Sequence, residues 1–424
     1  MTPRSLTVLA PIRPSEVAAL RQTLRAIGDD INGKRRSAAD PLPHIEFPRS
    51  RRIHFARFAI LNDPDRGAGR KRLLYASVYD GTLDTHLDEL MSITRGLDTI
   101  WDACEGYTGV KTFASYIRAH AYEPAAYYVA FRDETAASVS EAIAQRRRRE
   151  ELQDSGARSS AGPTTPSLVP YSTSGNGGLD RIRRALKRVG RAAPLLSDLV
   201  RALARFGFAN LYFGTRRIIA SLDRYPIFRL ANWLTRNRLP PLASPYSSLP
   251  LDVTAALAPL VPGDEIPFDA GETRPWFRED AVAQNQLTVV TVVPPAALER
   301  LGAVMAAIDS YAKRLAPPGA LIGISTIHFV RWLFIDQGRR LMLVSDYDGS
   351  WESYLDEFAE LIVSGLDAIW GTAVGAPPAG ARDVPAFKHF LRTHQVPADL
   401  FFSAYPNETV LNIVTDVAAP RDVR

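Results

Sequence analysis

The chain has 424 residues, 46% of them hydrophobic, so it is long enough for more than one domain and too apolar to be disordered throughout. Its 51 basic residues exceed its 46 acidic ones by too little to indicate a nucleic-acid partner. A single cysteine, Cys104, excludes a disulfide framework and any multi-cysteine metal site, and it fits a reducing compartment.

The N-terminal residues carry no signal for export. The apolar run from Leu6 to Arg13 is too short for the core of a signal peptide and contains no cleavage motif. Nowhere does the sequence hold about 18 consecutive uncharged apolar residues, the length that a membrane-spanning helix needs. We therefore expect a cytoplasmic protein.

Residues 1–152 predict a regular series of strands and helices. Short apolar runs bounded by turn residues are typical of buried strands, and apolar residues spaced by three or four positions are typical of helices. The predicted strands are 6–12, 53–61, 72–80 and 127–131, and the predicted helices begin at Pro14, after Gly81 and at Phe113. The helix after Gly81 is expected to be long and unbroken. The order βαββαβ is that of the ferredoxin-like motif.

The middle of the chain has a different composition. Residues 153–180 are rich in Ser, Gly, Pro and Thr and predict a disordered linker. Residues 181–238 hold fourteen basic residues and two acidic ones, with apolar residues between the arginines at helical spacing. We expect a basic amphipathic helical insert there, followed by an extended, proline-rich connection at 239–283.

Three partners are conceivable for the insert 181–238. A basic amphipathic helix with aromatic residues suits an anionic membrane surface, which would place the protein peripherally on the inner face of the membrane. The same helix can instead pack on the acidic remainder of this chain, because only six of the 51 basic residues are lysine and arginine richness is a general feature of the sequence. Nucleic acid is the third candidate, and we do not expect it. The membrane surface is the partner predicted here.

Residues 284–424 repeat the elements of residues 1–152. Ile53-His54-Phe55-Ala56-Arg57-Phe58 returns as Ile327-His328-Phe329-Val330-Arg331-Trp332, and Tyr79-Asp80-Gly81-Thr82 returns as Tyr347-Asp348-Gly349-Ser350. Several such blocks keep their order, which chance does not explain. The chain is therefore interpreted as a duplication.

The duplication predicts the architecture. A ferredoxin-like sheet alone leaves one face bare, and two such sheets can bury these faces against one another. The expected fold class is α+β: two tandem ferredoxin-like (βαββαβ) repeats forming a pseudo-twofold α+β barrel, with the basic helical insert between them. A central cavity for a ligand would lie between the repeats.

The repeated polar residues are the candidates for catalysis. Strand alternation predicts that His54 and His328 share the interior face with Phe58 and Trp332, while Arg57 and Arg331 point the other way. A histidine at a cavity can ligate haem iron or act as an acid or base; alternatively, it is a core histidine bonded to a backbone carbonyl. The predicted catalytic residues are His328, Asp348, Arg331, His54, Asp80 and Arg57.

Local geometry offers a second explanation for several of these residues. Asp80-Gly81 and Asp348-Gly349 suit tight turns, with Thr82 or Ser350 as the following helix N-cap. His120 and His394 are expected at helix C-termini, where a cation is favourable. The predicted cofactor-binding residues are His328, His394, Trp332 and Tyr347. No metal site is predicted, because no HExxH motif or histidine cluster occurs, and nucleotide-binding and nucleophile-elbow motifs are absent as well.

Two resemblances can be stated. The phrases Gln284-Asn285-Gln286-Leu287-Thr288, Ile327–Trp332, Tyr347–Asp356 and Ser403-Ala404-Tyr405-Pro406 resemble a family of uncharacterised bacterial proteins, which carries no function over. At the level of fold alone, tandem ferredoxin-like units are similar to the dimeric α+β barrel superfamily, which includes chlorite dismutases, dye-decolorising peroxidases and small monooxygenases. The GxxDG motif of the peroxidases is absent, and only the Asp-Gly of Tyr347-Asp348-Gly349 remains.

Two functions are carried forward from the sequence. The first is binding of a hydrophobic or haem-like small molecule between the repeats, with haem-dependent oxidoreductase chemistry at the membrane surface as its enzymatic form. The second is a non-catalytic scaffold or interaction protein whose core is filled by its own side chains.

Overall fold

The computed structural model describes residues 2–31, 45–67, 69–160 and 283–419. Most of the predicted linker, the whole insert 181–238 and nearly all of the connection 239–283 lie outside these residues. The chain divides into two units, of which one comprises 1–144 and 243–424 and the other 145–242. The fold described below is that of the first unit.

The first half contains four strands, and their bounds lie close to those predicted. The strands are β1 (Arg4–Pro11), β2 (Ile53–Asn62), β3 (Lys71–Tyr79) and β4 (Ala126–Val129). The helices are α1 (Val17–Ile31), α2 (Leu83–Ile93), α3 (Leu97–Trp101), α4 (Phe113–Ala119) and α5 (Ala136–Ser160).

The second half follows the same order. Its strands are β5 (Asn285–Val292), β6 (Ile327–Ile335), β7 (Arg340–Tyr347) and β8 (Leu400–Ser403). Its helices are α12 (Leu298–Arg314), α13 (Trp351–Leu361), α14 (Val363–Trp370), α15 (Val384–Thr393) and α16 (Val410–Ala418).

The strands form two antiparallel four-stranded sheets, which confirms the α+β class. The sheet orders are β1-β3-β2-β8 and β4-β6-β7-β5, so each sheet holds three strands of one half and the last strand of the other. Phe55 pairs with Ser403 of β8, and Phe329 pairs with Val129 of β4. The halves have therefore exchanged their last strands, which the strand pattern of the sequence did not indicate.

Each exchanged strand is preceded by a segment that also touches the other sheet. The backbone N–H of Leu9 in β1 donates to the carbonyl of His120 at 3.0 Å, and farther along this segment Ala125 N–H donates to Trp332 O in β6 at 2.8 Å. In the second half, Val396 N–H donates to Thr288 O in β5 at 2.8 Å, and Asp399 N–H donates to Phe58 O in β2 at 2.8 Å. Both open sides between the sheets are thus bridged by backbone hydrogen bonds.

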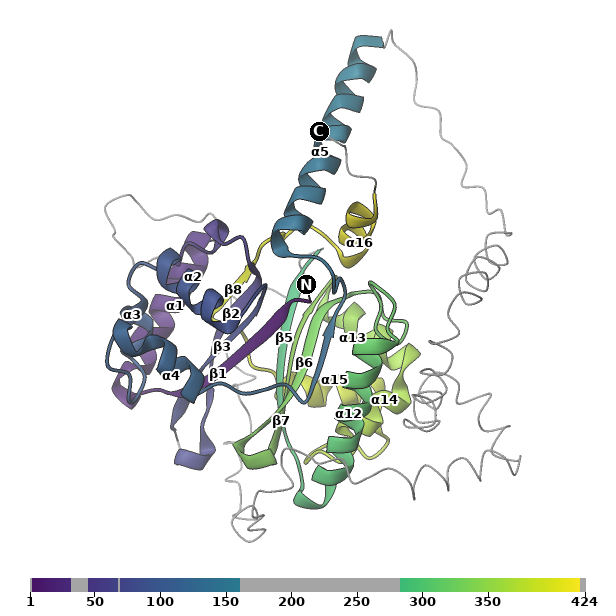
Figure 1. Cartoon of the computed structure of the whole chain (residues 1–424). Coiled ribbons are helices and arrows are strands. Elements are labelled where there is room, and N and C mark those ends of the chain that lie inside the picture. Colours follow the sequence, from purple (N-terminus) through teal and green to yellow (C-terminus); the bar gives the residue numbers. More distant parts are fainter. Residues whose placement is uncertain (1, 32–44, 68, 161–282, 420–424) are drawn as a thin grey trace, which may run out of the picture. The chain divides into compact units, whose positions relative to one another are not determined.

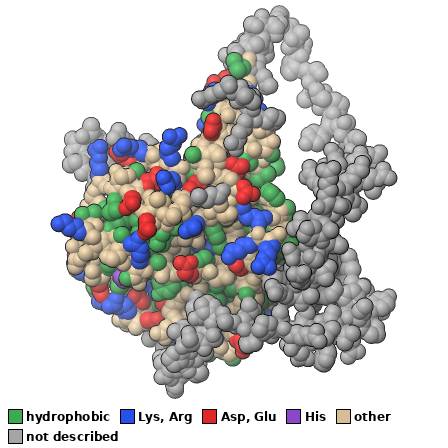
Figure 2. Space-filling view, viewed as in Figure 1, with side chains coloured by type: hydrophobic (Ala, Val, Ile, Leu, Met, Phe, Trp, Pro, Cys, Tyr) green, Lys and Arg blue, Asp and Glu red, His purple; other side chains and the backbone are tan. Residues whose placement is uncertain are grey.

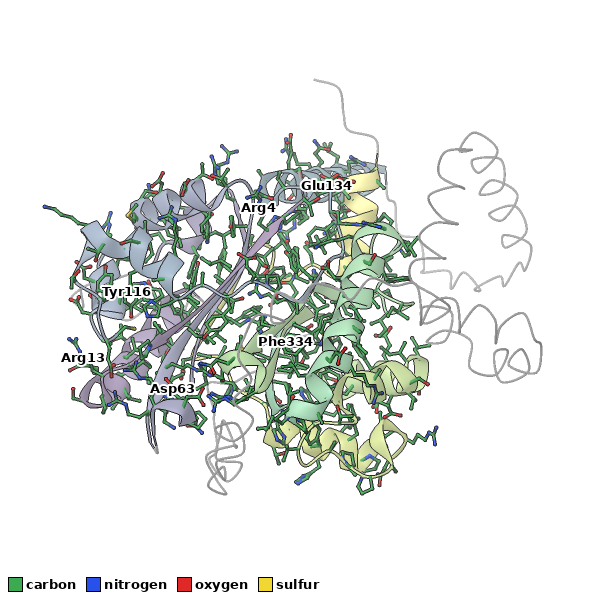
Figure 3. All side chains as sticks on the ribbon, turned by 60° about the horizontal axis from the view of Figure 1, so that its bottom comes forward. Arg4, Arg13, Asp63, Tyr116, Glu134 and Phe334 are labelled. Atoms are coloured by element: carbon green, nitrogen blue, oxygen red, sulfur yellow. The ribbon has the colours of Figure 1, made fainter. Side chains whose placement is uncertain are left out.

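Helices cover the outer face of each sheet, and the inner faces meet (Figure 1). Phe58 and Ile60 pack with residues of α1 and α3 on the outer side of the first sheet, and Trp332 and Phe334 pack with those of α12 in the second. Figure 3 labels Phe334 on β6 and Tyr116 among the helices of the first half. Between the sheets, buried residues of both form one apolar cluster: Leu9, Ala59, Leu61, Leu74, Ala76, Val290, Leu333, Ile335, Met342, Val344 and Val396.

Three expectations about local structure are wrong. Phe58 and Trp332 face the helices, and Arg57 and Arg331 lie on the inner faces of the sheets, the reverse of the predicted orientation. The prediction failed because both faces of β2 and β6 are buried, so no polar face distinguishes the inner side from the outer one. The long helix after Gly81 is broken into α2 and α3, where Gly96 has a positive φ of 79°. Residues 153–160 of the predicted linker are helical, as the end of α5.

Candidate functional site

The two repeated histidines each bond a repeated aspartate in the interior. Nε2 of His54 lies 3.1 Å from Oδ1 of Asp80, and Nε2 of His328 lies 2.7 Å from Oδ1 of Asp348. Both histidines are fully buried. The register of each second strand shifts at its histidine, between Ile53 and Phe55 and between Ile327 and Phe329, as it does at a β-bulge.

Each aspartate also holds the start of a helix. Oδ2 of Asp80 accepts a hydrogen bond from the backbone N–H of Ala136 at 2.7 Å, at the first residue of α5. Oδ2 of Asp348 accepts one from Val410 N–H at 2.7 Å, at the first residue of α16. A carboxylate at a helix N-terminus satisfies an N–H that has no partner within the helix and interacts favourably with the helix dipole. Both oxygens of each carboxylate are thus used within the fold.

An aromatic cluster surrounds the two histidines. Ring centroids of His54 and Phe329 are 5.4 Å apart, as are those of His328 and Phe55. Phe131 lies 6.1 Å from each histidine ring, which brings the two histidines of the duplication to one place. The structure thus unites His54, His328, Asp80 and Asp348 in one buried group.

The histidines differ at Nδ1. Nδ1 of His54 lies 2.7 Å from the hydroxyl of Tyr405, whereas Nδ1 of His328 has no hydrogen-bond partner among the described residues. An ionised carboxylate only accepts, so Nε2–H donates to the aspartate, and in the neutral imidazole Nδ1 is then the acceptor. The Tyr405 hydroxyl donates to that acceptor in His54. The residue that takes the place of Tyr405 in the first repeat is Phe131, which has no hydroxyl.

Arg57 crosses from the first sheet to the second. Its guanidinium forms an ion pair with Asp346 and donates to the carbonyls of Leu287 at 3.0 Å and Ser345 at 2.8 Å. It also donates to the side chains of Gln286 at 3.3 Å and Thr288 at 3.1 Å. A side chain that bonds two strands of the opposite sheet ties the sheets together through buried, charge-assisted hydrogen bonds.

Arg331 holds the same repeat position and makes fewer bonds. Nη1 donates to the carbonyl of Ser77 at 2.8 Å. Nε has no partner among the described residues, and neither do the buried hydroxyls of Thr7 and Tyr127. Asp346 interacts with Arg331 electrostatically without bonding it.

Burial dominates the electrostatics of this interior. Desolvation lowers the pKa of Arg57 even though Asp346 opposes it, and it lowers the pKa of Arg331 to about 10. Burial also raises the pKa of the Asp346 carboxyl against the effects of Arg57 and Arg331. Asp346 is therefore the ion-pair partner of Arg57 and acts on Arg331 only through its charge.

The remaining predicted site residues lie elsewhere. His394 caps α15, where Nδ1–H donates to Phe390 O at 2.7 Å, and His120 caps α4 in the same way through Tyr116 O at 2.9 Å. Trp332 packs against helices of the second half. Tyr347 stacks on Tyr354 with ring centroids 3.9 Å apart. Of the predicted cofactor-binding residues, only His328 belongs to the buried histidine group.

Sequence reasoning missed three polar residues of the interior. Asp346 could have been found because it replaces Val78 of the first repeat, a change from an apolar to an acidic residue in a buried strand. Gln286 and Tyr405 lie in the segments that resemble the uncharacterised bacterial family, but no sequence pattern indicated a role for either residue.

His86 stacks on Tyr79 with ring centroids 4.0 Å apart, and burial lowers its pKa to about 3, so it is a neutral core residue.

The expected caps and the cysteine agree with the structure. Thr82 accepts from Thr85 N–H, and Ser350 accepts from Ser353 N–H, so both act as N-caps. Cys104 is buried, and its burial raises its thiol pKa to about 12, which leaves it a small unreactive core residue.

Comparison with known proteins adds no relative. No family model matches the chain, and neither a curated protein nor a solved structure does. Within the described residues, no group of three or more His, Cys, Asp or Glu side chains has the arrangement of a metal site. The helices of these residues include none with the length and hydrophobicity needed to cross a membrane.

Proposed function

We propose that this protein is a non-catalytic interaction scaffold whose interior is filled by its own side chains. The observation that carries the proposal is that the candidate catalytic side chains are already hydrogen-bonded to other parts of the fold. Asp80 and Asp348 each hold a histidine and a helix start, and Arg57 bonds the opposite sheet. Groups engaged in this way position structure, and they are not free to act on a substrate.

The scaffold we propose is a pseudo-twofold α+β barrel of two ferredoxin-like repeats. The exchanged strands β4 and β8 support it, as do the backbone hydrogen bonds that bridge both open sides between the sheets. An eight-stranded barrel has an interior just wide enough for side chains to fill. The apolar cluster that includes Leu74 and Val344 supports a filled interior.

The partner we propose for this scaffold is an anionic membrane surface, contacted through residues 181–238. The support is the charge of that segment, with fourteen basic residues against two acidic ones. On the face of the described residues shown in Figure 2, acidic and basic side chains are interspersed, which offers no comparable basic surface.

Liposome flotation tests this proposal. The full chain should float with vesicles containing phosphatidylserine and remain in solution with neutral phosphatidylcholine vesicles. A variant lacking residues 181–238 should no longer float with the anionic vesicles, while retaining the melting temperature of the full chain. Equal flotation of the two proteins would reject the surface role.

One observation favours the other function, a hydrophobic or haem-like ligand. Nδ1 of His328 is a buried nitrogen without a partner among the described residues. The geometry does not fit an axial ligand of haem, however, because this ring packs against Phe55 at 5.4 Å and Phe131 at 6.1 Å. Titration with haemin decides the question: a Soret band that disappears in His328→Ala would establish haem binding and reject the filled interior.

A further inference from the structure

The duplication supplies an internal control for each buried arginine. Arg57 and Arg331 occupy the same repeat position on β2 and β6, and each donates to a serine carbonyl of the opposite sheet, Ser345 or Ser77. Their remaining surroundings differ. Comparing the two sites shows which hydrogen-bond acceptors of Arg57 have no counterpart beside Arg331.

Two replacements remove acceptors from Arg331. Asp346, the ion-pair partner of Arg57, corresponds to Val78 in the first repeat, and Gln286 corresponds to Ser5. Both Ser5 and Val78 lie on the inner face of the first sheet, where they pair with one another. A carboxylate and an amide are thus replaced by an apolar side chain and a short hydroxyl.

The hydroxyls that remain near Arg331 have no partners. Thr7 corresponds to Thr288, which accepts from Arg57 at 3.1 Å, yet Thr7 Oγ1 is buried without a partner among the described residues. The hydroxyl of Tyr127 is in the same state, and Tyr127 pairs directly with Arg331 across β4 and β6. Buried polar atoms of native proteins usually bond a protein group, a water or an ion.

The free edge of Arg331 has a defined shape. Nη1 bonds Ser77, whereas the buried Nε has no hydrogen bond to any described residue. Nε and Nη2 lie on one side of the planar guanidinium and present parallel N–H groups, which match the two oxygens of a carboxylate.

The buried positive charge of Arg331 would be stabilised by a bound anion. Although burial lowers its pKa to about 10, the guanidinium stays protonated at neutral pH. Only 3% of the residue is exposed, and no carboxylate forms an ion pair with it among the described residues. A buried charge without a partner is strongly destabilising.

The two ends of the paired sheets differ in exposure beside these arginines. Ser5 and Tyr127 are half-buried, whereas Gln286, which takes the place of Ser5 beside Arg57, is 3% exposed. The short serine side chain leaves this end of the first sheet more open than its counterpart in the second.

We propose that Arg331, Thr7 and Tyr127 form a binding site for a small carboxylate between the sheets. The Nε and Nη2 groups of Arg331 bind the two carboxylate oxygens, and the hydroxyls of Thr7 and Tyr127 donate to them. The ligand takes the place that the Asp346 side chain has beside Arg57. The site goes beyond the scaffold function, because it needs room only for a carboxyl group and leaves the rest of the interior filled.

Thermal denaturation of the full-length protein tests the site, with formate as the probe. Ionic strength is held constant with methanesulfonate, and chloride serves as a spherical anion for comparison. A ligand that binds only the folded state raises the melting temperature with its concentration. We expect a saturable rise of a few degrees with formate and a smaller rise with chloride. An equal or larger rise with chloride, or no rise with formate, would overturn the carboxylate assignment.

Substitution at Val78 gives the sharpest control. Val78→Asp supplies an internal carboxylate at the position of Asp346, so it should raise the melting temperature without formate and abolish the response to formate. Val78→Asn has the same size without the charge, so it should raise the melting temperature less than Val78→Asp does. Arg331→Met should also lose the response, which decides the matter if Val78→Asp does not fold. A response that persists in either Val78→Asp or Arg331→Met would refute the site.

Native mass spectrometry of the protein as purified separates two sources of the carboxylate. A bound mass that is released on denaturation and is absent from Arg331→Met identifies a carboxylic acid retained from the cell. Protein without any bound mass, together with a formate response, identifies a site for freely exchanging small anions. Both results support the site, and a bound mass that persists in Arg331→Met contradicts it.

Discussion

At the scale of single residues, one hydroxyl distinguishes the two histidines of the duplication. Tyr405 donates to Nδ1 of His54 at 2.7 Å, while Phe131, in the same repeat position, leaves Nδ1 of His328 without a donor. The same buried pair of rings therefore contains one satisfied and one unsatisfied acceptor. Because the surroundings are otherwise alike, the energetic value of that hydrogen bond can be measured within one protein.

Tyr405→Phe should destabilise the protein by about 1–3 kcal/mol, the cost of leaving a buried acceptor without a donor. The measurement is the urea dependence of unfolding, compared by linear extrapolation. Phe131→Tyr is the matched control. It should cost less than Tyr405→Phe, because its hydroxyl can reach the vacant acceptor of His328. Wild-type stability of Tyr405→Phe would show that the hydroxyl is not a net contributor.

At the scale of elements, the aspartates couple strand ends to helix starts. Asp348 follows β7, and it joins the histidine of β6 to the first N–H of α16. Asp80 does the same between β3, β2 and α5. One carboxylate thus fixes the position of three elements, and the helix start depends on a residue more than fifty positions earlier in the chain.

Asp348→Asn should loosen the start of α16. The neutral asparagine removes the charge from the hydrogen bonds to His328 and Val410, so at least one charge-assisted bond worth about 1.5–3 kcal/mol is lost. Hydrogen exchange should become faster at Val410–Ile413 and unchanged in α13. Ser350→Ala is the control, since it removes the N-cap of α13 and should accelerate exchange there. Unchanged exchange in α16 of Asp348→Asn would contradict the coupling.

The elements also show what the sequence could and could not predict. The strand ranges and the order βαββαβ follow from apolar runs and turn residues, so β2 was predicted from 53 to 61 and spans Ile53–Asn62. The facing of Arg57 could not be predicted, because every residue from Ile53 to Leu61 is buried and alternation then has no polar side. The pairing of β8 with β2 joins residues far apart in the sequence, so no local sequence pattern could predict it. The histidine–aspartate pairing was not predicted, because the apolar pattern of the strand gives no signal of the register shift at His54.

At the scale of the whole fold unit, a buried ion cluster joins the two halves at the hairpin loops. Arg72 of β3 bonds both oxygens of Asp336, at 2.6 and 2.8 Å, and Arg340 of β7 pairs with the same carboxylate. Burial alone would raise the pKa of Asp336, but the hydrogen bonds and charges of Arg72 and Arg340 outweigh it and lower the pKa. The cluster therefore makes the contact between the halves dependent on pH.

Stability should fall in acid through Asp336. Its folded pKa lies below the ordinary value of 3.8, so its carboxylate contributes stability above that pH, and the contribution is lost as the pH falls through the folded pKa. Asp336→Asn should cost about 3–5 kcal/mol at pH 7, because it leaves buried arginines without their acid. Urea midpoints measured from pH 5 to pH 2 should decline less steeply in this variant than in the wild type. Parallel declines would assign the acid sensitivity to other carboxylates.

The strand exchange makes the two halves one cooperative unit. Neither half can complete its own sheet, because β8 supplies the edge beside β2 and β4 supplies the edge beside β6. Opening either half removes the hydrogen bonds of the other, so amides of β3 and β7 should exchange with the same free energy of opening. Asp336→Asn should lower both values equally, whereas Leu411→Ser, at an exposed position of α16, should change neither. If β3 and β7 opened with clearly different free energies, the halves would be independent domains, and their shared interior would not be the basis of the fold.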